Sequence, residues 1–200
     1  YLERVDAINA LCGDGPQFYS LHLDVEPHVL PEVKRDGMEG YIPRFVELIR
    51  DARAQADKRG LQLEWDIPAW FGKFHDAEND CSLTETIFRY CEAVGIMAYS
   101  DTAEGQYRVV MPNVEIAKKT GKHLMIGCET MDLDEARRED GNCAISYFEE
   151  GKIYMYKCLQ TIMRDVAETY DAFGFAIHDV KRWIALQPHV LPKYAEVYGK

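Results

Sequence analysis

Short apolar runs alternate along this chain with longer segments whose apolar residues recur at helical spacing. One helical stripe runs from Ile42 to Ala56 and stops before Gly60, and another runs from Tyr156 to Tyr170. Strands that alternate with helices in this way indicate an α/β fold with a parallel sheet. Five runs have the length and composition of strands buried on both faces: 18–26, 61–67, 94–99, 123–129 and 173–178.

The connections between these elements differ in length according to their direction. Turns from helix to strand are tight, whereas the segments that follow the strands are long: 27–40, 68–81, 100–109 and 130–144. Long loops at the carboxyl ends of parallel strands carry the active sites of barrels and doubly wound sheets. No GxGxxG or P-loop sequence follows a strand, which argues against nucleotide-binding forms of the fold.

The number of strands suggests part of a larger barrel. A complete (β/α)8 barrel takes about 250 residues, and this chain opens within a helical pattern formed by Val5, Ile8 and Leu11, without an initiator Met. We therefore expect residues 1–200 to form a single, partial TIM-barrel domain, the C-terminal portion with about strands four to eight. A five-stranded flavodoxin-like domain is the structural alternative. The two open edges of a partial sheet predict that the isolated segment forms a homo-oligomer or is poorly soluble.

The composition of the chain argues against several kinds of binding partner. The chain has 34 acidic against 23 basic residues, a net charge of -11, and no Lys/Arg cluster longer than a pair. This balance argues against nucleic acid as a partner, and no apolar stretch is long enough for a membrane span. The six cysteines show no CxxC spacing, so a zinc ribbon is not expected. Cys91, Cys128 and Cys158 lie in apolar segments and should be buried, whereas pairing of Cys81 with Cys143 stays open.

Acidic residues end most of the predicted strands. A carboxylate close to a core is costly unless it is paired or used. The strand-end residues are Asp24 and Glu26, Asp66, Tyr99 and Asp101, Glu129, and His178 with Asp179.

The strongest signal lies in the first strand. Alternation places His22, Asp24 and Glu26 on one face, which in a barrel is the inner face. Two carboxylates this close repel each other, so one is expected to hold its proton to higher pH, as a general acid must. His22 is in a position to tune that charge. The alternative is that these acids have a structural role, in which they form ion pairs with basic side chains inside the barrel.

The segment from Tyr19 to Pro27 resembles the D-x-x-D-x-D-x-E motif of chitinase-like (family 18) glycoside hydrolases, and Met97-Ala98-Tyr99 resembles their M-x-Y. The resemblance implies that Glu26 protonates the glycosidic oxygen and that Asp24 assists a substrate N-acetyl group, which Tyr99 binds. Tyr19 and His22 stand where the motif has its first two acids. The "LDVEP" and "ETM" segments also resemble uncharacterised bacterial glycoside-hydrolase-like barrels, which implies a role with carbohydrate.

These features predict a glycoside hydrolase that acts on an oligosaccharide or glycan without metal or cofactor. The catalytic candidates are Glu26, Asp24, Tyr99 and Glu129. Rings such as Trp70 can stack on sugars. One alternative is a metal-dependent sugar isomerase or phosphoesterase that uses the strand-end carboxylates; the other is a non-catalytic carbohydrate-binding barrel. The substrate-binding candidates are His22, Asp66, Trp70, Asp101, Asp179 and Trp183.

Overall fold

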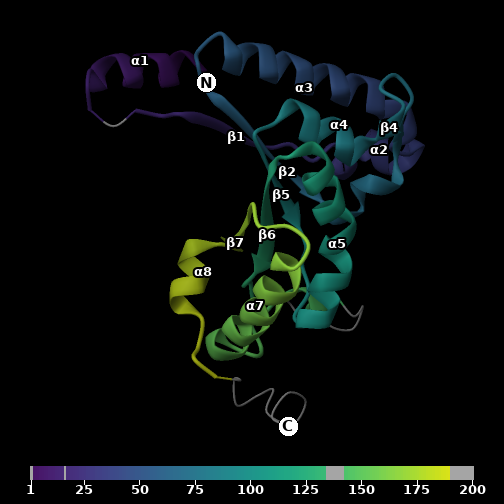
Figure 1. Cartoon of the computed structure of the whole chain (residues 1–200), viewed down its shortest axis with the longest axis vertical. Coiled ribbons are helices and arrows are strands. Elements are labelled where there is room, and N and C mark those ends of the chain that lie inside the picture. The colour runs from purple at the N-terminus through teal and green to yellow at the C-terminus, as the bar shows by residue number, and fades with distance from the viewer. Residues whose placement is uncertain (1, 16, 134–141, 190–200) are drawn as a thin grey trace. The chain divides into compact units, whose positions relative to one another are not determined.

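The computed structural model describes residues 2–15, 17–133 and 142–189. Its contacts group the chain into two compact units, one formed by residues 1–67 and 71–94 and the other by residues 68–70 and 95–200 (Figure 1). The strand β5 (Ala93–Met97) begins in the first unit and ends in the second. Whether residues 1–200 form one domain stays a prediction.

The first unit contains two parallel strands, four helices and a small hairpin. Three short 3-10 helices, Pro27–Val29, Glu39–Tyr41 and Ala69–Lys73, lie in its loops or at its boundary. Its main elements are α1 (Leu2–Cys12), β1 (Ser20–Asp24), α2 (Pro31–Asp36), α3 (Ile42–Asp57), β2 (Gln62–Pro68), β3 (His75–Asp76), β4 (Cys81–Ser82) and α4 (Leu83–Tyr90).

The core of the first unit lies between β2 and the helices α3 and α4. Alternate residues of β2, namely Leu63, Trp65 and Ile67, are fully buried. The Trp65 ring meets Phe45 of α3 edge to face at 5.8 Å between centroids, and α3 packs against α4. The Ser82 side chain accepts a hydrogen bond from the N–H of Glu85 at 3.2 Å and so caps the N-terminus of α4.

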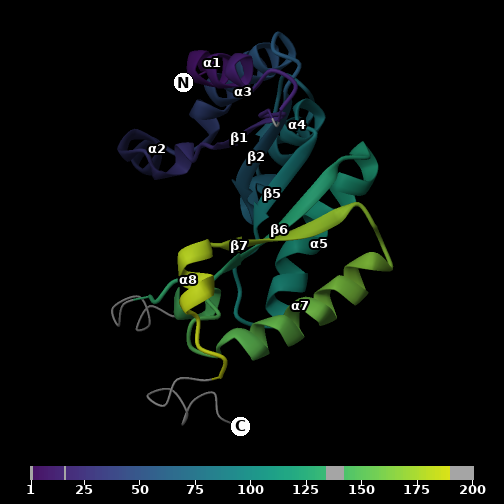
Figure 2. The ribbon, with the colours of Figure 1, turned by 90° about the vertical axis from the view of Figure 1, so that its left-hand side faces the viewer.

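The second unit has two parallel strands that pair along their whole length (Figure 2). The helices α5 (Ala103–Thr120) and α7 (Lys152–Ala167) pack against each other. A buried Gln106 accepts from the Tyr147 hydroxyl at 2.9 Å and donates to the Gly127 carbonyl at 2.9 Å, so this polar group in the core has its partners. The elements are α5 (Ala103–Thr120), β6 (His123–Glu129), a 3-10 helix (Asn142–Ile145), α7 (Lys152–Ala167), β7 (Phe173–His178) and α8 (Val180–Ala185).

The α/β class with a parallel sheet is confirmed, and five strands have the hydrogen-bonded order β1-β2-β5-β6-β7. The strands in the described part of the chain do not close into a barrel. One expectation was wrong: more exposed residues alternate with more buried ones along β1 and β2, so these strands are not fully buried on both faces. The physical reason is that their second face carries charged side chains, which remain hydrated.

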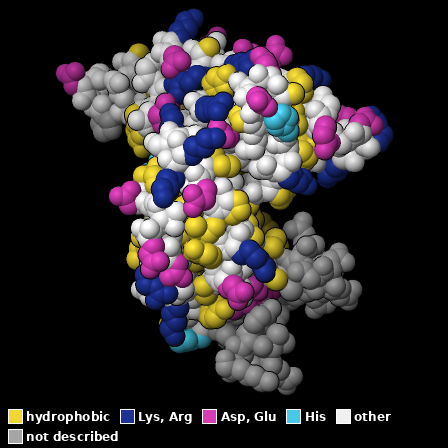
Figure 3. All heavy atoms as spheres, turned by 45° about the vertical axis from the view of Figure 1, so that its right-hand side comes forward, with side chains coloured by type: hydrophobic (Ala, Val, Ile, Leu, Met, Phe, Trp, Pro, Cys, Tyr) yellow, Lys and Arg dark blue, Asp and Glu magenta, His cyan; other side chains and the backbone are white. Residues whose placement is uncertain are grey.

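The surface carries charges of both signs, and several cysteines are free thiols. Lys and Arg side chains are interspersed with Asp and Glu on the face drawn in Figure 3. No helix in the described residues is long and apolar enough to cross a membrane. Cys91, Cys128 and Cys158 are buried free thiols, as predicted, and Cys81 is also free. The side chain of Cys143 lies outside the described residues.

Candidate functional site

The polar face of β1 and β2 holds a histidine between two carboxylates. The parallel register places His22 opposite Glu64 and Asp24 opposite Asp66. His22 donates from Nε2 to Asp66 at 2.8 Å and from Nδ1 to Glu64 at 2.9 Å. These hydrogen bonds, that to Asp66 foremost, outweigh partial burial and raise the pKa of His22 to about 9. The imidazole is therefore a cation at neutral pH that offsets part of the negative charge of this face.

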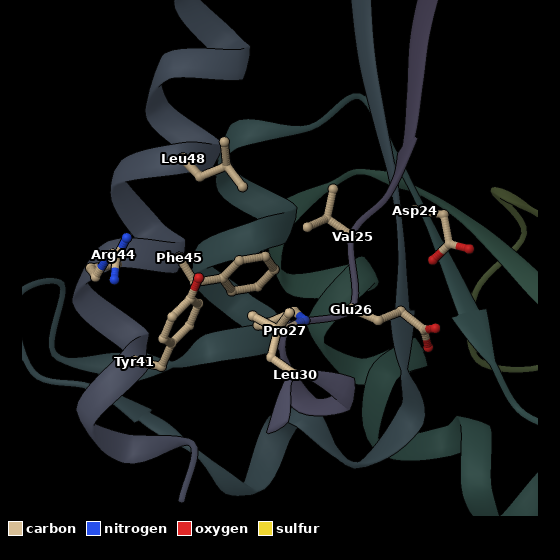
Figure 4. Close-up of a pocket in the computed structure, with 9 residues that line it drawn as sticks. All are labelled: Asp24, Val25, Glu26, Pro27, Leu30, Tyr41, Arg44, Phe45 and Leu48. Atoms are coloured by element: carbon tan, nitrogen blue, oxygen red, sulfur yellow. The ribbon is translucent and has the colours of Figure 1, made fainter. Parts of the chain in front are cut away.

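Asp24 ends β1, and Glu26 extends the same face beyond the strand. Figure 4 shows both side chains on one side of the chain and Val25 on the other, as the alternation predicted. Glu26 precedes the 3-10 helix Pro27–Val29, and its side chain caps no N–H there. Its Oε1 lies 3.6 Å from Nε2 of His28. The carboxylate is 33% exposed, so it is accessible to a ligand.

A cavity of about 440 Å³ lies beside this segment, between the end of β1 and helix α3. Its wall includes Val25, Leu30 and Phe45, and Arg44 covers the Tyr41 ring at 5.4 Å on the helix side. The carboxylates of Asp24 and Glu26 point away from these side chains (Figure 4). Asp24 and Glu26 nevertheless belong to the lining of the cavity, so the cavity adjoins the carboxylate face.

In the second unit, the ends of β6 and β7 join Glu129 to His178. Nδ1 of His178 lies 3.0 Å from Oε2 of Glu129. The other oxygen, Oε1, accepts from the backbone N–H groups of Thr130 at 2.7 Å and Met131 at 2.8 Å. The Glu129 side chain is only 8% exposed. Glu129 thus has no oxygen directed freely toward a ligand, whereas His178 is half-exposed.

Three further acids interact elsewhere in the second unit. Burial, together with the charges of Asp101 and Glu149, raises the pKa of Glu150 to about 8. Burial also raises the pKa of Asp101. Even so, no three His, Cys, Asp or Glu side chains in the described part of the chain are placed to hold a metal ion.

The remaining site candidates have varied surroundings. The Tyr99 ring lies against Gly127 of β6, where a Cβ would be 3.3 Å from the ring. Asp179 caps α8 by accepting from the N–H of Arg182 at 3.0 Å, and it also pairs with that guanidinium group. Trp183 donates to the Tyr156 hydroxyl at 3.0 Å. Trp70 is 42% exposed in its 3-10 helix.

The predicted residues thus fall into two groups, each described within its own unit. The first unit brings His22 together with Asp66, and it places Asp24 and Glu26 on one side of the chain. The candidates in the second unit are Trp70, Tyr99, Asp101, Glu129, Asp179 and Trp183.

Sequence reasoning missed several members of these groups. Glu64 was recognisable because it stands two residues before Asp66, and therefore on the same strand face. His28 follows Glu26 at the same spacing. The acid pair Glu149 and Glu150 carried no comparable signal, because it precedes a helix and does not end a strand.

Comparisons with known proteins give weak similarities. No protein-family model matches the chain, and no curated protein matches it. One similar solved structure is the PgaB glycoside hydrolase domain from Bordetella bronchiseptica, with 12% identity and a TM-score of 0.43 over 79% of this chain and 42% of that one. Another is the GH18 chitinase ChiB from Flavobacterium johnsoniae, with 12% identity and a TM-score of 0.43 over 89% of this chain and 59% of that one. A third is catalytic domain 2 of a group II chitinase from Ostrinia furnacalis, with 16% identity and a TM-score of 0.37 over 63% of this chain and 37% of that one.

Two of these structures are chitinases and the third is a glycoside hydrolase domain, so the resemblance to chitinase-like glycoside hydrolases is also found among solved structures. The chain spans less than two thirds of each of them. With TM-scores of 0.37 to 0.43, these similarities do not indicate the reaction, which is inferred instead from the arrangement of the side chains.

Proposed function

We propose that this chain carries the acid site of a glycoside hydrolase that acts on an oligosaccharide or glycan, with Glu26 as general acid and Asp24 assisting. The observation that supports this most directly is their shared direction at the carboxyl end of β1. We also propose that the parallel strands belong to a (β/α)8 barrel, of which this chain supplies about strands four to eight. The structure of a longer chain that includes residues 1–200 tests the barrel.

The chemistry assigns a different task to each carboxyl group. Glu26 donates its proton to the glycosidic oxygen as the bond from that oxygen to the anomeric carbon breaks, and the leaving sugar keeps the proton. Water then forms a bond to the anomeric carbon and gives a proton to the Glu26 carboxylate, which restores the acid. Asp24 stabilises the positive charge that develops on the sugar or on its N-acetyl group. The cation at His22 limits the total negative charge on this face, because it neutralises part of the charge of Glu64 and Asp66.

The test is turnover of a panel of chromogenic 4-nitrophenyl glycosides, with and without chelator. We expect metal-independent turnover that Glu26→Gln lowers at least about 100-fold, because general acid catalysis contributes about 10²–10⁴-fold. The matched control is Glu32→Gln, which removes an exposed carboxylate from α2 and should leave the rate unchanged.

Two outcomes would contradict the proposal. Activity that chelator abolishes would favour a metal-dependent sugar enzyme. Saccharide binding without turnover, preserved in Glu26→Gln, would favour a carbohydrate-binding protein. In both cases the role assigned to Glu26 would be wrong.

A further inference from the structure

The pair of Glu129 and His178 is arranged so that only the histidine can act on a ligand. Oε1 of Glu129 accepts two backbone N–H groups, and Oε2 faces Nδ1 of His178 at 3.0 Å. An ionised carboxylate only accepts hydrogen bonds, so Nδ1 must carry the proton that joins the two side chains. In the neutral imidazole this leaves the lone pair on Nε2.

The position of His178 is held from two sides. Its carbonyl oxygen accepts from the N–H of Thr130 at 2.8 Å and from the Thr130 hydroxyl at 2.7 Å, which ties the end of β7 to the residue after β6. Its ring is held by Glu129. The ring is nevertheless 51% exposed. A fixed ring with an accessible acceptor nitrogen is the arrangement that a general base requires.

The carboxylate next to His178 in the chain has partners of its own. Asp179 follows His178 in the chain, and its carboxylate is held by the N–H and guanidinium groups of Arg182. Since the N–H and hydroxyl of Thr130 already join β6 to β7 here, the contact between Glu129 and His178 is not needed to hold the strands together.

We propose that Glu129 and His178 form a proton-transfer pair that acts on a hydroxyl group or water at the ends of β6 and β7. Nε2 of His178 takes the proton, and the oxygen keeps the electron pair of the O–H bond and forms a bond to the carbonyl carbon of an ester. The imidazolium keeps its Nδ1 proton, which is hydrogen-bonded to Glu129, and returns the Nε2 proton to the leaving oxygen as the bond from the carbonyl carbon to that oxygen breaks. Glu129 is the positioning residue. The inference stands apart from the role of Glu26, because every residue in it belongs to the second unit.

Two measurements test the pair without knowledge of the natural substrate. Nitrogen-15 NMR reads the tautomer of the neutral His178 ring, which we expect to carry its proton on Nδ1 and to shift toward the Nε2–H form in Glu129→Gln. Hydrolysis of 4-nitrophenyl acetate then measures removal of a proton from water. We expect His178→Gln to lower this rate at least about 10-fold, because positioned bases contribute about 10²–10⁴-fold. Glu129→Gln should lower kcat with little change in KM.

The matched control is His75→Gln, since His75 is an exposed histidine whose carboxylate neighbour, Asp80, lies 3.5 Å away and is itself exposed. This variant should hydrolyse the ester at the wild-type rate. A wild-type His178 ring that carries its proton on Nε2 would overturn the inference. So would ester hydrolysis at equal rates in the wild type, His178→Gln and His75→Gln. The wild-type tautomer decides the question even if Glu129→Gln fails to fold. Neither result depends on glycoside turnover, so failure of this pair is distinct from failure of Glu26.

Discussion

Replacement of Glu150 by Gln should stabilise the protein at alkaline pH. Glu150 is 4% exposed, and its Oε2 is buried without a hydrogen-bond partner. Burial, together with the charges of Asp101 and Glu149, raises its pKa to about 8. The folded protein therefore keeps a proton on Glu150 at pH 7, where the unfolded chain has already lost it. Gln resembles the protonated carboxyl in size and carries no charge.

The sign and size of the effect follow from the two pKa values. Between the ordinary pKa of 4.5 and the folded value of about 8, the free energy of unfolding of the wild type falls as pH rises, by about 1.4 kcal/mol for each pH unit. The full difference between the two pKa values sets an upper bound of about 5 kcal/mol at pH 8 and above. Below pH 4.5 the carboxyl is protonated in both states, and this contribution vanishes.

Urea unfolding followed by tryptophan fluorescence at pH 4.5, 6 and 8 measures this difference. The gain in unfolding free energy of Glu150→Gln over the wild type should grow steadily across the series. The control is Glu115→Gln, which removes an exposed carboxylate from α5 and should give a gain that does not change with pH. If the two variants show the same pH dependence, Glu150 is not held protonated by burial and the reasoning is wrong.

Three more predictions concern other parts of the chain. The His22 ring should titrate near pH 9 by NMR, and Asp66→Asn should lower this pKa, so an unshifted titration in that variant would contradict the assignment. The stability that the charge on His22 contributes is complete below pH 6.5 and is lost as pH rises through 9. Ser82→Ala should cost about 1 kcal/mol of unfolding free energy through loss of the α4 cap, whereas an unchanged urea midpoint would show that the cap is dispensable. The isolated segment should self-associate through open sheet edges, and a monodisperse monomer in sedimentation would count against a partial barrel.

The sequence predicted the parts of this structure that depend on local pattern. The strands 123–129 and 173–178 have the predicted bounds, because apolar runs between turn signals define them. The common direction of Asp24 and Glu26 followed from their i, i+2 spacing, although β1 ends at Asp24 and Glu26 lies beyond it. The partners of His22 depend on the register between β1 and β2. Such a register is set by packing across the sheet, and one sequence does not specify it.

The same distinction explains the strand-end acids in the second unit. The acidic character of Glu129 and Asp179 was visible in the sequence, but their hydrogen bonds were not. Glu129 is held by the two residues that follow it and by His178, and Asp179 is held by the first turn of α8. Burial of Glu150 depends on the tertiary packing of the second unit, which has no counterpart in local sequence pattern.

The alternate burial along β2 has a consequence for how this protein can diversify. Leu63, Trp65 and Ile67 pack beneath the helices, while Glu64 and Asp66 lie on the other face of the same strand. Exchanging the polar pair therefore leaves no void beside Phe45, and repacking Trp65 leaves the charge pattern intact. Ligand preference and folding stability can then evolve at neighbouring positions with little conflict. A one-residue insertion within β2 is the exception, because it would exchange the two faces and damage both properties at once.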